Sequence, residues 1–202
     1  MLVGFNHVSI YSDLVFANAG IPLHLVTFAT IGVFGASFVA AIFGSKVVAK
    51  FGPLKVILVT NAVIIFSIAL FTVSRATSHL APTVIPYITI VAVGVYLVVW
   101  KGGLNVALFP LLVSFTVEAT RATVLAYGSV VLWSMSWMVA FVGPYLQYHL
   151  GPYEMMIWLG CALVGLILMG VFLPETKGKN SDQIQAYFKG RAAKASETHS
   201  NL

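Results

Sequence analysis

Lys101 lies deep inside an apolar run, from Val84 to Val113, that carries no other charged side chain. If that run crosses a membrane, a cation at such depth costs about 2.5–3.5 kcal/mol on insertion scales, and neither end is close enough for easy snorkelling. Either the ammonium reaches a water-filled vestibule without touching substrate, or it faces a cavity, where it selects against cations or pairs with an anionic substrate. Exchange of Lys101 for glutamate separates these alternatives.

Other residues with reactive chemistry are scattered. Four histidines show no metal-ligand spacing and are expected to be exposed or in loops: His7, His24, His79 and His149. Cys161 is the only cysteine, which excludes an internal disulfide and indicates a small core residue. Asp13 either binds a coupling proton or, as we expect, caps a helix end. With no Gly-x-x-x-x-Gly-Lys loop and no nucleophile–base pair, we expect neither an ATP-driven pump nor an enzyme, and no cofactor.

The elements that position these residues follow from composition. Hydrophobic residues make up 59% of the chain and charged residues 8%, against roughly 25% charged in soluble domains. The apolar residues come in blocks long enough to cross about 30 Å of hydrocarbon. We therefore predict an all-α integral membrane protein with six transmembrane helices, the fourth irregular near Gly102 and Gly103. The predicted spans are residues 2–16, 23–43, 56–73, 84–113, 122–146 and 155–173. The first run lacks the basic start and the cleavage site of a signal peptide.

Basic residues gather on alternate connections, which predicts the orientation. Lysines flank the second-to-third connection, Arg121 follows the fourth span, and further basic residues fill the end of the chain: Lys46, Lys50, Lys55, Lys177, Lys179, Lys189, Arg191 and Lys194. Arg75 is the only strong base on the opposite side. Because basic loops stay in the cytoplasm, we expect the amino end and the tail there, and residues 17–22, 75–83 and 148–152 outside.

The last apolar run ends in Leu-Pro-Glu-Thr-Lys-Gly, residues 173–178. A proline-led, charged hexamer at the end of a final membrane helix resembles the signature of sugar porters in the major facilitator superfamily. Four other segments of the chain resemble the same family. Residues 4–12 look like its seventh helix, and residues 48–52 like the basic loop between helices eight and nine. Arg121 lies twelve residues before Trp133, and the two match the arginine after helix ten and the tryptophan of helix eleven. The turn at 151–153 matches the short turn before helix twelve.

The resemblance covers nearly the whole chain but only the carboxyl-terminal six of the family's twelve helices. It implies transport of a hexose or a related sugar or polyol by alternating access, with substrate held between two six-helix halves. The chain is either a fragment of a longer product or a half-sized product that must pair. Two functions of different class remain open: half of a transporter, or a truncated, non-transporting protein that associates with a full-length relative.

The resemblance also implies substrate contacts. Asn6 aligns with a sugar-binding asparagine, whose carboxamide both donates and accepts hydrogen bonds. Trp133 aligns with a tryptophan that offers a flat face and an indole N–H. Both have the alternative of a packing role. Tyr11 is a candidate gate, packing residue or ligand. Several positions depart from the family pattern, and among them Ser37 replaces an asparagine, Phe109 a tryptophan and Lys101 a glutamate. These departures leave the fold expectation intact and bear on specificity.

The resemblance also implies a gating role for a second set of residues. It comprises Lys50 and Gly52 of the basic loop, Glu118 and Arg121 after the fourth span, and the exit residues Pro174, Glu175, Thr176, Lys177 and Gly178. The family closes this side with an acidic–arginine network. In this chain Lys50, Lys55, Glu118 and Arg121 are the residues available for a reduced substitute.

Residues 174–202 form the predicted cytoplasmic tail. Ser181 and Asp182 favour the start of a short helix, in which Ile184, Tyr187 and Phe188 share one face against the inner leaflet. Ser200-Asn201-Leu202 has the Ser-x-hydrophobic form that PDZ domains accept, although such endings are common by chance. The expected partners are therefore the lipid bilayer, a sugar, a missing amino-terminal half or a related transporter, and a PDZ domain. We expect no nucleic acid, and we expect the plasma membrane as the location.

Overall fold

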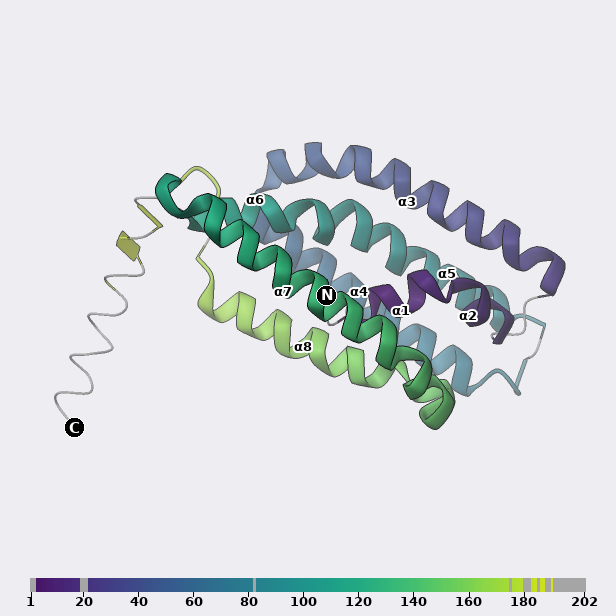
Figure 1. The fold of residues 1–202 in the computed structure, drawn as a ribbon. Helices are drawn as coiled ribbons and strands as arrows, with labels where there is room; N and C mark the ends of the chain where they lie inside the picture. The colour runs from purple at the N-terminus through teal and green to yellow at the C-terminus, as the bar shows by residue number, and fades with distance from the viewer. Residues whose placement is uncertain are drawn as a thin grey trace.

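The computed structural model describes residues 3–18, 22–81, 83–174, 176–179, 183–184, 186–187 and 190. The regular structure of these residues is entirely helical, which confirms the all-α prediction (Figure 1). The elements are α1 (Phe5–Ile10), α2 (Ser12–Asn18), α3 (Leu23–Phe51), α4 (Pro53–Ala76), α5 (Ile85–Val99), the π-helical η1 (Trp100–Leu104), α6 (Asn105–Phe115), α7 (Glu118–Leu150), the 3-10 helix η2 (Gly151–Tyr153) and α8 (Met155–Phe172).

Five helical stretches in the described part are long and apolar enough to cross a membrane. They run over His24–Phe51, Pro53–Ala76, Ile85–Phe115, Glu118–Tyr153 and Met155–Phe172. They correspond to the second to sixth predicted spans. Large apolar side chains on their outer faces are exposed, as lipid-facing residues are expected to be, because hydrocarbon replaces water around them.

The first predicted span is not one long helix. Residues 5–18 form two short helices, α1 of six residues and α2 of seven, separated at Tyr11. The backbone of Tyr11 has φ −105° and ψ 25°, outside the α-helical region, which ends α1. Even unbroken, the predicted residues 2–16 would extend only about 22 Å, less than the roughly 30 Å of hydrocarbon. The predicted count of six crossing helices is therefore not confirmed.

Helices α3, α4 and α7 are longer than predicted because polar residues continue them past the apolar run. The apolar prediction ended at residue 43, whereas α3 continues through Lys46 and Lys50 to Phe51. Gly52 then adopts φ 90°, a conformation that favours glycine, and ends the helix. Pro53 begins α4, where its missing N–H costs nothing because the first turn of a helix has no acceptor for it. Similarly, α7 begins at Glu118, four residues before the predicted 122.

The irregularity predicted near Gly102 and Gly103 is confirmed, since Trp100–Leu104 is a π-helical segment between α5 and α6. The absence of side chains there permits unusually close packing of the backbones. A Cβ at Gly44 of α3 would overlap the carbonyl oxygen of Gly102, and a Cβ at Gly103 would overlap Thr60 of α4. Small residues are what allow membrane helices to approach this closely.

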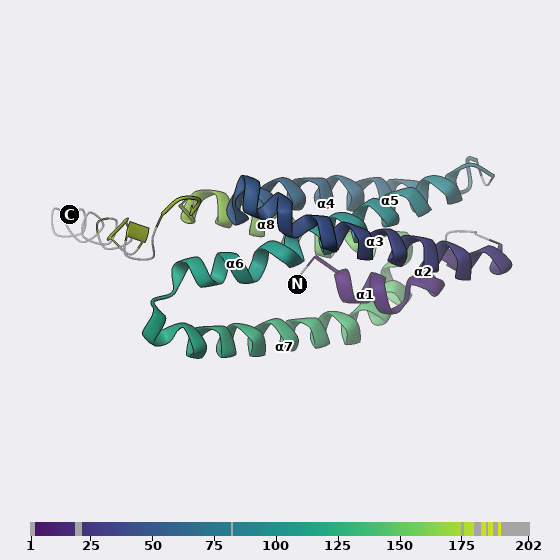
Figure 2. The same ribbon diagram turned by 90° about the horizontal axis from the view of Figure 1, so that it is seen from above.

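Two buried clusters hold the helices together. The larger lies among α1, α4, α5 and α8 and includes Phe5, Ile64, Tyr96, Trp100 and Trp158. The smaller lies at the end of the bundle where α3 meets α4, and it includes α6 residues. Figure 1 shows α3 and α8 at opposite edges of the molecule. In Figure 2, α7 lies on the far side of α1 and α6 from α3.

Candidate functional site

The first group of candidate residues meets where α1 packs against the π-helical segment. The rings of Phe5 and Trp100 are stacked, with centroids 3.5 Å apart and planes inclined by 9°. The Lys101 ammonium lies 5.1 Å from the centroid of Phe5 and 5.6 Å from that of Trp100. Lys101 is half-buried, and Asn6, the neighbour of Phe5 in sequence, is half-buried as well. The π-helical segment thus places Lys101 next to α1, the helix that contains the predicted substrate residue Asn6.

Among the residues that the structure describes, the Lys101 ammonium has two aromatic contacts and no ion pair with an acidic residue. A ring face is electronegative and attracts an ammonium group, more strongly where water is partly excluded. Its two ring contacts therefore offset part of the cost of placing Lys101 deep in the apolar run. Lys101 is half-buried, so its side chain is also partly accessible.

The other predicted substrate residues are not gathered at this point. Ser37 is buried, and its hydroxyl donates a 2.7 Å hydrogen bond to the carbonyl oxygen of Val33 in its own helix. Trp133 on α7 is 71% exposed and Phe109 on α6 is 44% exposed. Tyr11 is half-buried, with its ring 5.6 Å from the ring of His7. In the part of the chain that the structure describes, no hydrogen bond or ring contact joins Trp133 to Asn6 or Lys101.

The exit motif and the predicted gating loop do come together, at the Gly52 end of the bundle. The Lys177 ammonium donates a hydrogen bond to the carbonyl oxygen of Lys50, across 127 residues of sequence. The Lys50 ammonium lies 5.4 Å from the ring of Phe51. Pro174 and Thr176 are buried, and Gly178 turns the chain with φ 74°.

The remaining gating residues are less engaged. Glu118 is exposed, Arg121 is half-buried, and no ion pair joins the two among the described residues. The Nε atom of Arg121 is buried without a hydrogen-bond partner. Glu175 lies outside the described residues, as do Ser181, Asp182, Phe188 and Ser200–Leu202 of the tail. Two residues of the helix face predicted in the tail are described: Ile184 is buried and Tyr187 is exposed.

One charged cluster was missed by the sequence reasoning. His7 was expected to be exposed or in a loop, and this expectation was wrong: its side chain is 0% exposed and its Nε2 lies 3.3 Å from Oε2 of Glu154, which is also 0% exposed. Arg75 donates from Nη1 to the other oxygen of Glu154 at 3.0 Å. His24, His79 and His149 are exposed, as predicted.

The elements explain how these charges are tolerated together. Glu154 precedes α8, where the positive end of the helix dipole favours an anion, and Arg75 lies in the last turn of α4, where the dipole favours a cation. Gly143 of α7 makes room for the His7 ring, because a Cβ there would overlap its Nδ1 atom. The available signal in the sequence was that Arg75 is the only strong base on its side and Glu154 an isolated acid beside an apolar span.

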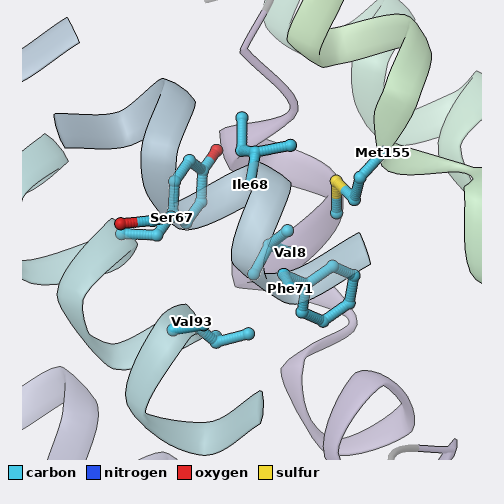
Figure 3. A pocket seen from close by; sticks show the side chains of 8 residues that line it. Val8, Ser67, Ile68, Phe71, Val93 and Met155 are labelled. Carbon is cyan, nitrogen blue, oxygen red and sulfur yellow. The ribbon is translucent and has the colours of Figure 1, made fainter. Parts of the chain in front are cut away.

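Two cavities lined by described residues have walls that offer few partners for sugar hydroxyls. One, between α1, α4, α5 and α8, has a volume of about 10 Å³ and walls of mainly apolar side chains (Figure 3). Such a space is barely sufficient for one water and offers it few polar partners. A groove of about 510 Å³ lies between the facing ends of α3 and α4, lined by Val47, Phe51, Lys55, Val56, Leu58, Val59 and Thr60. Its lining suits a lipid chain better than sugar hydroxyls.

Comparisons with known proteins show the family of the chain. The family described as "Sugar (and other) transporter" matches residues 1–188. The chain is 27% identical to solute carrier family 2, facilitated glucose transporter member 5, of Pongo abelii, over 93% of this chain and 37% of that relative. It is 27% identical to the Equus caballus member 5, over 98% of the chain and 39% of the relative. Member 9 of Pongo abelii is 25% identical, over 94% and 33% respectively.

The chain therefore spans less than two fifths of the length of these curated relatives. Its long apolar helices, with apolar side chains on their outer faces, are those of an integral membrane protein. The match over residues 1–188 shows that the chain belongs to the sugar transporter family of the major facilitator superfamily, whose members are transporters and not enzymes.

Proposed function

We propose that this chain forms the carboxyl-terminal half of a transporter that moves a hexose, or a related small sugar or polyol, across a membrane by alternating access. The family match over residues 1–188 is the observation that carries the proposal. The curated relatives are named as facilitated glucose transporters, and the chain covers less than two fifths of each. The proposal requires an amino-terminal half, because alternating access needs two halves that rock about a shared site.

In this proposal the substrate lies against the face formed by α1, the π-helical segment, α6 and α7. Asn6 supplies paired donor and acceptor groups, and Trp133 supplies a flat apolar surface with an N–H. The exposure of Trp133 and Phe109 supports the assignment, since a wall residue of a shared cavity is open when the other wall is absent. Tyr11 lies at the break between α1 and α2, where a gate would move. Ser37 contributes through packing, with its hydroxyl bonded to its own helix.

The second candidate is a half-sized protein that does not transport and instead associates with a full-length relative. The exposed aromatic residues of α7 favour it, because they present an apolar face for which this chain supplies no cover. In either case we propose residence in the plasma membrane, with the amino end and the tail in the cytoplasm. The basic residues on the connections and in the tail support that orientation.

Hexose uptake by two forms of the protein tests the first proposal against the second. One form is the chain alone. The other is the chain joined behind the amino-terminal half of the Equus caballus facilitated glucose transporter member 5, a relative that it matches over 98% of its own length. At matched surface expression, we expect radiolabelled hexose uptake from the joined form only. A joined form that reaches the surface but shows no uptake above background, while the chain alone lowers uptake by a co-expressed relative, would establish the second candidate.

A further inference from the structure

His7, Glu154 and Arg75 form a buried polar cluster that has no role in the transport function proposed above. Two of its three side chains are 0% exposed, and Arg75 is 11% exposed. The three come from α1, from the turn before α8 and from the end of α4. Removing two ionisable groups from solvent costs free energy unless their charges are matched. We therefore expect a functional role of this cluster in addition to packing.

The charges of the cluster leave His7 as its adjustable member. An arginine is charged at all physiological pH values. Nη1 of Arg75 donates a 3.0 Å hydrogen bond to Oε1 of Glu154, which gives the carboxyl group a cationic partner. With neutral His7 the formal charge of the three groups is zero. When a proton from water binds the lone pair of the imidazole, His7 becomes an imidazolium, no other bond changes, and the formal charge becomes +1. Histidine is the side chain for which this change falls near neutral pH.

The other titratable groups at the end of α1 and on the helices α2, α5 and α7 that contact it include Tyr11, Asp13, Tyr96, Tyr145 and His149. Tyr11, at the end of the same helix, lies ring to ring with His7 at 5.6 Å. Asp13 on α2 is exposed and accepts a 2.6 Å hydrogen bond from Thr30, and the Tyr96 hydroxyl of α5 donates to the carbonyl oxygen of Val3. On α7, Gly143 meets the ring, while Tyr145 and His149 are exposed and contact each other.

The site is closed by the helices around it. Gly143 of α7 covers the Nδ1 atom and Glu154 covers the Nε2 atom, so a proton reaches the ring only when α1 moves away from α7 or α8. Helix α1 has six residues and is separated from α2 at Tyr11, so it can shift without moving a long helix. We propose that His7 is a proton-binding site, held by Glu154 and Arg75, whose loading and release accompany the movement of α1 during transport. The coupling to transport rests on the proposed function, whereas the proton site does not.

The proton site is tested on the purified chain in detergent micelles, with ¹⁵N-labelled imidazole rings followed by NMR from about pH 5 to pH 8. The His7 signal, identified by its loss in His7→Gln, should change between the neutral and protonated forms within this range. Glu154→Gln should reduce the protonated share at a given pH, and Arg75→Gln should increase it, since the two variants remove opposite charges. His79→Gln, an exposed control, should leave the signal unchanged.

A His7 signal that does not respond to pH would overturn the site, and so would two charge variants that shift it in the same direction, as a general loosening would do. Coupling is tested in liposomes with the joined form, using a pH-sensitive dye: hexose should carry protons with it, and His7→Gln should abolish proton movement while hexose still enters. Hexose entry without proton movement in the unaltered protein would overturn the coupling. Absence of hexose entry with a responsive His7 would instead contradict the transport proposal and leave the proton site standing.

Discussion

At the scale of single residues, the cation of Lys101 lies over the rings of Phe5 and Trp100. Each exposed cation–ring contact is worth about 0.5–1 kcal/mol, rising to about 2 kcal/mol when water is excluded. Because Phe5 and Trp100 stack on each other with centroids 3.5 Å apart, the ammonium cannot face both rings squarely, and the contacts offset only part of the about 2.5–3.5 kcal/mol that a lysine costs in the middle of a membrane span.

We predict that Lys101→Glu changes substrate preference in a transporting assembly. Reversal of the charge places a carboxylate against two electronegative ring faces and repels an anionic substrate, whereas a neutral sugar is less affected. A hydrogen bond to a charged group contributes about 1.5–3 kcal/mol, so the uptake of an anionic sugar should fall at least about tenfold relative to hexose. Competition between labelled hexose and a sugar acid measures the preference, with Lys101→Arg as the charge-conserving control. Unchanged preference and pH dependence in Lys101→Glu would leave the water-filled vestibule as the role of Lys101.

We also predict that Asn6→Ala and Trp133→Ala weaken hexose binding. Loss of a group that bonds a substrate hydroxyl costs about 1–3 kcal/mol, hence roughly ten- to hundredfold in affinity. The measurement is the concentration dependence of labelled hexose uptake by the joined form at matched surface expression. Phe66→Ala is the control, because Phe66 is an exposed aromatic residue of α4, 69% exposed, with no proposed contact to substrate. Uptake as in the unaltered protein for both variants would show that the two residues serve packing.

At the scale of elements, the close contact of α3 with the π-helical segment depends on glycine at position 44. The carbonyl oxygen of Gly102 occupies the place where a Cβ would stand. Backbone cannot move aside as a flexible side chain can, so even one added methyl group must push the helices apart. The same contact carries Lys101 toward α1, and it therefore supports the candidate site as well as the fold.

We predict that Gly44→Ala destabilises the protein although alanine is the better helix former. Overpacking costs about 1–3 kcal/mol, more than the roughly 1 kcal/mol that alanine gains over glycine in a helix. Gly35→Ala on the same helix is the matched control, because nothing lies within 4 Å of a Cβ there. Thermal unfolding in detergent should show a lower midpoint for Gly44→Ala and an equal or higher midpoint for Gly35→Ala. Equal midpoints for the two variants would mean that the helices do not meet through Gly44.

At the scale of the whole molecule, the proposed orientation places the Gly52 turn and the exit motif on the cytoplasmic side. The contact of Lys177 with the carbonyl oxygen of Lys50 shows that both lie at one end of the bundle. The cluster of His7, Glu154 and Arg75 would then lie toward the outer side, since residues 75–83 and 148–152 join helices at the opposite end.

We predict that a protease added to intact cells spares the tail beyond Pro174. The tail contains five of the eleven lysine and arginine residues and should be cut by trypsin once the membrane is permeabilised. An antibody to an epitope added at the carboxyl end follows both reactions, and a second epitope in the 75–83 connection reports the outer side. Cutting of the tail without permeabilisation would reverse the topology.

The long helices were predictable from the sequence because a membrane leaves few choices. In hydrocarbon every backbone polar group needs a partner within the protein, so an apolar block of sufficient length becomes a helix. The turn at Gly52 and Pro53 and the irregular segment at Gly102 and Gly103 were also encoded locally, since glycine and proline limit what the backbone can do. Helix ends were less predictable, because Lys46 and Lys50 are polar and yet continue α3.

By itself, then, the sequence determined the helical class, the five long apolar segments and the family, all of which depend on local composition or on motifs of a few residues. The tertiary structure decided that His7 is buried against Glu154, that Arg75 completes the cluster from 79 residues before Glu154, and that the Lys101 ammonium lies 5.1 Å from the centroid of the Phe5 ring. The physical reason is that burial and charge pairing depend on which helix faces meet. That choice is made by the packing of the whole bundle, through small residues such as Gly143, and no local pattern records it.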